Sequence, residues 1–90
     1  MADRLMRVTA YTTLDLADAV VKGHDFEEER HAVVDATSDR EEPDCVRLQV
    51  ELDNMTEEHL PAHMEEIQLT PEQARKLATD LEKHADRVEP

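Results

Sequence analysis

The chain is short of aromatic residues, glycine and cysteine, and each shortage excludes a class of structure or chemistry. Tyr11 and Phe26 are its only aromatic residues, so little bulky apolar volume is available for a core. The single glycine, Gly23, excludes the Gly-rich loops that cradle phosphates in nucleotide-binding proteins. The single cysteine, Cys45, cannot form an internal disulfide, which agrees with a reducing compartment.

Long apolar runs are absent as well. No stretch of the sequence approaches the roughly 20 apolar residues that a membrane-spanning helix needs. The opening Met-Ala-Asp-Arg lacks the apolar stretch of a signal peptide. We therefore expect a cytoplasmic protein that has no membrane partner.

Basic residues are scarce, whereas acidic residues are abundant. The chain carries 23 Asp and Glu against 10 Lys and Arg, a formal net charge of -13. Because affinity for DNA and RNA comes largely from Lys and Arg that neutralise phosphates, we expect no nucleic-acid partner. The excess also makes the folded chain repel itself unless salt screens it, and the Debye length falls from about 10 Å at 0.1 M to about 3 Å at 1 M. The composition therefore predicts a halophilic, salt-adapted protein.

Periodicity predicts one domain over residues 1–90 that contains several strands. Apolar and polar residues alternate over residues 45–53, which is typical of a half-buried strand. Residues 31–37 predict a second strand, and the polar segment 38–44 joins the two as an antiparallel hairpin. Residues 6–11 and 65–69 predict two further strands.

The C-terminal part predicts a helix. Thr70 suits the N-cap, Pro71 suits the first helical position, and Gln73 completes a capping-box pattern. Apolar residues then recur at helical spacing as one stripe: Ala74, Leu77, Ala78, Leu81, Ala85 and Val88. The predicted fold is α+β, an antiparallel sheet of about four strands with this helix packed on one face. Residues 14–22 predict a second short helix, although their Val20–Val21 pair would also suit a strand.

Three residues are candidate metal ligands. His59 and His63 stand four apart, as two zinc ligands on a helical turn would, and Cys45 precedes them. A fourth ligand is missing, and Pro61 disrupts the turn that would align the histidines, so we expect solvated loop histidines and no cofactor. The acids near Cys45 are expected to raise the pKa of its thiol, which disfavours a nucleophilic thiolate.

The composition and the fold favour a non-enzymatic binding or assembly module. One helix covers only one face of the sheet, so the other face is polar, covered by residues 14–22, or buried against a partner. We favour the partner, and we expect a homo-oligomer or a complex with another protein. The interface candidates are Leu5, Tyr11 and Val33, on the face opposite Ala32, Val34, Met6 and Val8. Two alternatives stay open: a metal-dependent sensor or enzyme that uses the three candidate ligands, and an acidic mimic of nucleic acid.

Four segments together resemble a known family. They are Arg7–Leu16, Val33–Ser38, Val46–Asn54 and Leu69–Arg75, and they span nearly the whole chain. The chain resembles small acidic haloarchaeal proteins of unknown function. The resemblance implies a salt-adapted cytoplasmic protein, and it implies no catalytic or binding residue.

Overall fold

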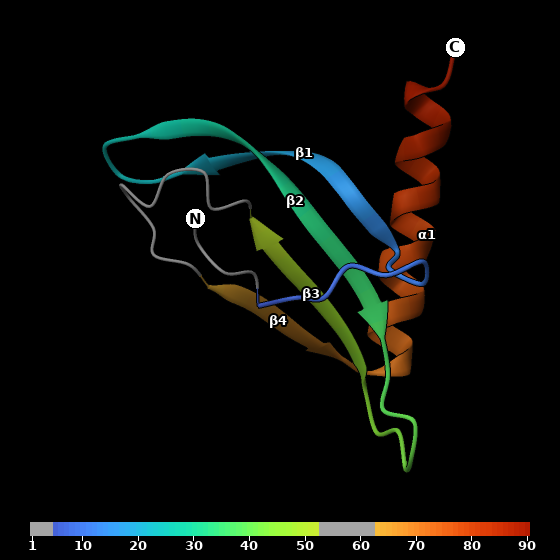
Figure 1. The fold of residues 1–90 in the computed structure, drawn as a ribbon. Helices are drawn as coiled ribbons and strands as arrows, with labels where there is room; N and C mark the ends of the chain where they lie inside the picture. The colour runs from blue at the N-terminus through green and yellow to red at the C-terminus, as the bar shows by residue number, and fades with distance from the viewer. Residues whose placement is uncertain (1–4, 53–62) are drawn as a thin grey trace.

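The computed structural model describes residues 5–52 and 63–90 (Figure 1). Four strands precede one helix: β1 (Leu14–Lys22), β2 (Glu27–Thr37), β3 (Val46–Leu52), β4 (Met64–Leu69) and α1 (Pro71–Val88). The strands form one antiparallel sheet in the order β1-β2-β3-β4, so each strand pairs with its neighbour in the sequence. The predicted α+β fold is confirmed.

The helix predicted over residues 14–22 is wrong, because this segment is β1. It pairs with β2 from Ala17 opposite Ala32 to Lys22 opposite Glu27. The turn between the strands is closed by Gly23, whose backbone N–H donates to the carbonyl of Phe26 at 2.8 Å. The apolar spacing of residues 14–22 suits a helix, and their two adjacent valines suit a strand. Pairing with β2 decides in favour of the strand.

The strand predicted over residues 6–11 is also wrong, because this segment forms no strand and ends in a compact turn. The backbone N–H of Thr12 donates to the Thr9 carbonyl at 3.2 Å, and the Thr9 N–H donates to Thr12 Oγ1 at 2.9 Å. Threonine side chains that hydrogen-bond the nearby backbone compete with strand pairing. In residues 9–12 these local hydrogen bonds form in place of a strand.

The sheet has an apolar face and a polar face, which follow from the pairing because residues that face each other across a ladder share a side. We define the apolar face by the following residues: Leu14, Ala17, Ala19, Val21, Ala32, Val34, Ala36, Val46, Leu48, Val50, Leu52, Ile67 and Leu69. Three charged residues also lie on it: Glu28 and Arg30, which form an ion pair, at one end, and Glu65 opposite Val50 on β4. The polar face carries Asp18, Val20, Glu29, His31, Val33, Asp35, Arg47, Gln49, Glu51, Glu66 and Gln68.

The N-terminal segment, residues 5–13, crosses the polar face, in front of the sheet in Figure 1. At one end, Leu5 and Met6 bond Glu51 of β3; at the other, Thr13 donates its N–H to Asp35 of β2 at 3.0 Å. Within the described part of the chain, the buried residues are Met6, Ala32, Val33 and Glu51. The core is therefore very small.

The helix α1 begins as predicted. Thr70 Oγ1 accepts from the Gln73 N–H at 3.1 Å, and Gln73 Oε1 accepts from the Thr70 N–H at 2.9 Å, which completes the capping box. The helix leaves the end of β4 and rises beside the sheet (Figure 1). None of its side chains is buried, and Leu81 in the middle of the stripe is 63% exposed. Within the described residues, the stripe of α1 is therefore not buried, and the apolar face is mostly half-buried, with Leu14, Ala36 and Ile67 exposed.

Candidate functional site

The candidate site is the apolar face of the sheet together with the apolar stripe of α1. At the edge of the sheet, Ile67 is 51% exposed, and in the middle Leu48 and Val50 are half-buried. Apolar surfaces this extensive on a folded chain typically mark an interaction site. We therefore take these two apolar surfaces together as the candidate site.

The surface area of the chain supports this interpretation. A compact 10.3 kDa monomer is expected to expose roughly 5,400 Å², whereas this chain exposes 7648 Å². Its radius of gyration is 14.8 Å, against about 12 Å for a compact domain of the same length. The chain thus exposes about 2,200 Å² more than a self-contained domain would.

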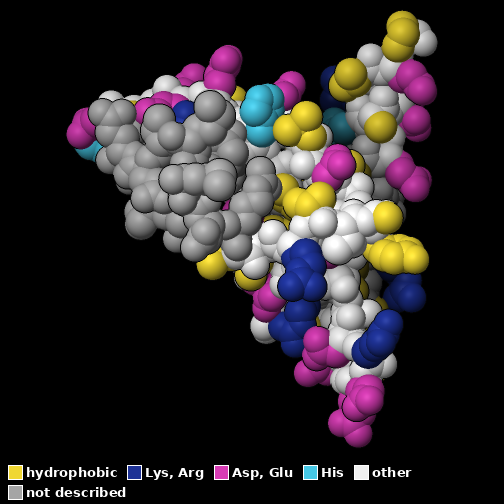
Figure 2. Space-filling model, in the orientation of Figure 1, with side chains coloured by type: hydrophobic (Ala, Val, Ile, Leu, Met, Phe, Trp, Pro, Cys, Tyr) yellow, Lys and Arg dark blue, Asp and Glu magenta, His cyan; other side chains and the backbone are white. Residues whose placement is uncertain are grey.

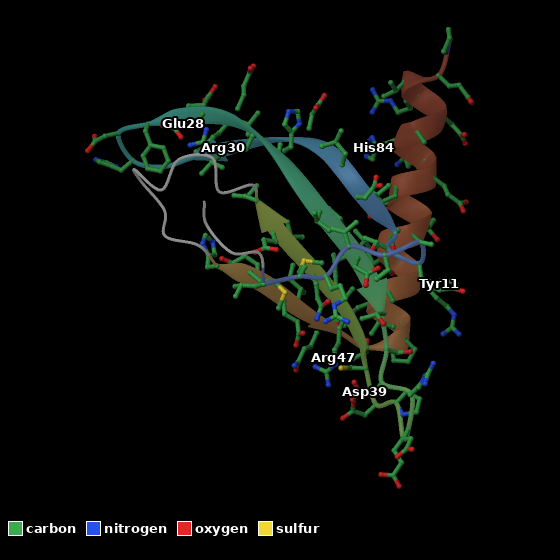
Figure 3. All side chains as sticks on the ribbon, viewed as in Figure 1. Tyr11, Glu28, Arg30, Asp39, Arg47 and His84 are labelled. Carbon is green, nitrogen blue, oxygen red and sulfur yellow. The ribbon has the colours of Figure 1, made fainter. Side chains whose placement is uncertain are left out.

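The three predicted interface residues lie in different environments. Tyr11 is 94% exposed in the turn that ends the N-terminal segment (Figure 3), and Leu5 is also exposed. Val33 is only 1% exposed and is part of the small core on the polar face. Two of the three candidates therefore lie on the surface of a single chain, and Val33 does not.

A hydrogen-bonded cluster lies at one end of the polar face, around Arg47 (Figure 3). Arg47 bonds Asp39 through Nε at 3.2 Å and Nη2 at 3.1 Å, and Glu66 through Nη1 at 2.9 Å. Gln49 and Gln68 also donate to Glu66, at 2.9 and 3.1 Å. These bonds, first those from the two glutamines and then that from Arg47, lower the pKa of Glu66. The cluster ties the β2–β3 loop to two strands and holds Glu66 ionised, which is a structural role.

The structure separates two of the predicted metal ligands. Cys45 precedes Val46, which pairs with Leu69 at one end of the β3–β4 ladder, and His63 precedes Met64, which pairs with Glu51 at the other. The two ends lie five residue steps apart along β3, or about 17 Å, so Cys45 and His63 do not bind the same ion. His63 instead pairs with Glu65 at 3.1 Å. The third candidate, His59, lies outside the described residues, as does Pro61.

In the described ranges, 5–52 and 63–90, no group of three or more His, Cys, Asp or Glu side chains could hold a metal ion. The pKa of the Cys45 thiol is raised, first by desolvation and then by the charge and hydrogen bond of Asp44, while Arg47 opposes the shift. The predicted direction is confirmed. A thiol that stays protonated is a poor nucleophile.

Sequence reasoning missed two parts of this site. The β1 residues of the apolar face were assigned to a helix, although the Val20–Val21 pair was a signal for a strand. The carboxylate of Glu51 is only 1% exposed, although Glu51 is one of the polar residues in the alternation over 45–53 and its local sequence carries no signal of burial.

Figure 2 shows the polar face from the side of Figure 1, with acidic side chains along the rim and on the helix and with Lys and Arg toward the lower end.

Within the part of the chain that the structure describes, no helix is both long and apolar enough to cross a membrane.

Comparison with known proteins places the chain in a family. No curated protein and no solved structure matches it. A family of unknown function, DUF6360, matches residues 1–90, and the chain belongs to that family.

Proposed function

We propose that this protein is a non-enzymatic assembly module that forms a homodimer and buries the apolar face of its sheet against a second copy. One observation carries the proposal: none of the α1 side chains is buried, and the apolar face of the same chain has exposed residues on both edge strands, Leu14 at 49% and Ile67 at 51%. A chain that presents two apolar surfaces, one on a sheet and one on a helix, already contains the two halves of an α+β core.

The exposed area is sufficient for such a dimer. A standard interface buries about 800 Å² on each partner, and obligate homodimers bury more. The excess of about 2,200 Å² on this chain exceeds the standard value and falls in the obligate range. A second copy of this chain would therefore be enough to cover the excess surface, and no other protein is required.

Salt adaptation belongs to the same proposal. Two copies bring a formal charge of -13 each into contact, which opposes association unless counter-ions screen it. We propose that the protein works in the concentrated salt of a halophilic cytoplasm, where the Debye length is only a few ångströms. The charge supports this part of the proposal, and the resemblance to haloarchaeal proteins agrees with it.

The mass in solution tests the proposal. Sedimentation equilibrium in molar KCl, at tens of micromolar protein, is expected to give twice the chain mass of 10.3 kDa. A mass of one chain under these conditions would overturn the proposal.

A matched pair of variants locates the interface. Ile67 and Val20 are 51% and 52% exposed on the two edge strands, but Ile67 lies on the apolar face and Val20 on the polar face. Ile67→Asp is expected to give a monomer, because an ionised carboxylate would be buried against the partner. Val20→Asp adds the same charge and is expected to leave the dimer intact. Equal effects of the two variants would mean that the apolar face is not the contact.

A further inference from the structure

We infer that the two copies of this dimer exchange helices, so that α1 of each copy packs across the apolar face of the other. The inference rests on the proposed function and specifies which surface of the partner occupies the site. It follows from three properties of the chain: the single stripe of α1, the distribution of charge, and the place where α1 leaves the sheet.

The helix has one apolar side only. Opposite the stripe, α1 carries charged and polar residues: Glu72, Lys76, Thr79, Lys83, Asp86 and Arg87. Such a helix cannot lie between two sheets, since its charged side would be buried. A dimer that stacks the two sheets directly buries the apolar faces but leaves both stripes in water. Helix exchange buries the stripes and the faces together and leaves the charged sides exposed.

The charge of the chain is distributed unevenly between helix and sheet. The helix contains four Asp and Glu and four Lys and Arg, so α1 is formally neutral. Residues 1–70 contain eighteen acidic and six basic residues, a formal charge of -12. Stacked sheets would bring two strongly acidic bodies together, whereas exchange places a neutral helix on each of them. Because like charges in contact oppose association, the charge distribution favours exchange.

The position of α1 suits an intermolecular contact. Only Thr70 separates β4 from the helix, and its extended backbone (ψ 161°) sets the direction in which the helix leaves the edge of the sheet. At 18 residues, α1 is about 27 Å long. Four strands about 4.8 Å apart span about 14 Å between the outer strands, so the helix is long enough to cross all four strands of a partner.

Cross-linking between two differently tagged chains tests the exchange. Both chains carry Cys45→Ser. One also carries Leu81→Cys on the stripe, and the other carries Leu48→Cys on the apolar face. After the chains are mixed, unfolded and refolded together in molar KCl, a short bismaleimide is expected to link the two tags. The control replaces Leu81→Cys with Thr79→Cys on the charged side of the same helix, and no link between the tags is expected from it.

The outcomes separate this inference from the proposed function. A dimer mass with a tag-to-tag link from Leu81→Cys but not from Thr79→Cys supports exchange. A dimer mass without the Leu81→Cys link overturns exchange and leaves self-association standing. A link of equal yield from Thr79→Cys also overturns exchange, because the apolar side of α1 would then be no closer to the partner's sheet than the charged side. A monomer mass overturns the proposed function and the inference with it.

A binding measurement gives a second readout. Leu81→Ala removes one side chain from each of the two predicted contacts, and it is expected to raise the dimer dissociation constant by at least about 100-fold. Thr79→Ala is expected to change it only a few-fold. A Leu81→Ala dimer as tight as the unmodified one would contradict the predicted burial of the stripe.

Discussion

The buried carboxylate of Glu51 gives the sharpest test of how the N-terminal segment is held. Its Oε2 accepts from the Leu5 N–H at 2.7 Å, and its Oε1 accepts from the Met6 N–H at 2.9 Å. Glu51→Gln keeps the shape but turns one acceptor into a donor, so one backbone N–H loses its partner. A hydrogen bond to a charged group contributes about 1.5–3 kcal/mol, and a buried unsatisfied donor costs about 1–3 kcal/mol.

Removing a buried charge offsets part of this loss, because the neutral amide has a smaller desolvation penalty. We therefore expect Glu51→Gln to lower the free energy of unfolding by about 2 kcal/mol. The assay is urea unfolding in constant molar KCl, at one fixed protein concentration, followed by far-ultraviolet circular dichroism. Glu29→Gln, the same change at an exposed site on the same face, is the control and is expected to stay within about 0.5 kcal/mol. If Glu51→Gln lowers the free energy of unfolding by no more than the control does, the two hydrogen bonds from the N-terminal segment to Glu51 do not stabilise the fold as argued.

Three further predictions follow from charge. The urea midpoint is expected to rise steeply between dilute buffer and molar KCl, because screening relieves a formal charge of -13; a flat response would contradict the salt-adapted interpretation. Because its pKa is raised, Cys45 is expected to react slowly with thiol reagents at neutral pH, and its rate is expected to reach half its maximum above pH 9.0; a half-maximal rate below that pH would contradict the shift. The pKa of Glu66 is lowered in the folded chain, so its stabilisation is present above its ordinary pKa of 4.5 and is lost as the pH falls through the folded-state value. Glu66→Gln is therefore expected to lose less stability than the unmodified protein between about pH 6 and about pH 3, measured by urea midpoints.

The parts of the fold that depend on neighbouring residues were predictable from the sequence. The capping box of α1 involves only Thr70 and Gln73, and both of its hydrogen bonds are formed. The alternation over residues 45–53 likewise predicted β3, because a strand with one buried side carries its period in its own residues. The antiparallel partner of β3 was predicted by the polar connection before it.

The parts that depend on distant residues were not predictable. Residues 14–22 satisfy a helical spacing and a strand preference equally, and the ladder with β2 decides between them. Glu51 shares a side with Arg47 and Gln49, which predicted exposure, but the backbone that buries it lies 46 and 45 residues away along the chain. No local pattern contains that contact. The apolar face could not be predicted from local sequence for the same reason, since it becomes continuous only when the four strands pair.

The small core and the acidic surface have one explanation if the protein is built as a dimer. Within the described residues, a single chain buries only Met6, Ala32 and Val33 among its apolar residues, which is little for a sheet of four strands. A second copy would complete the core on the apolar face, but its charge opposes the approach of the first. An obligate dimer has no stable folded monomer, so folding and association would be a single equilibrium between unfolded chains and folded dimer. Ion concentration would shift that equilibrium. The neutral helix would fit such a dimer, since the element proposed to contact the partner carries no net charge.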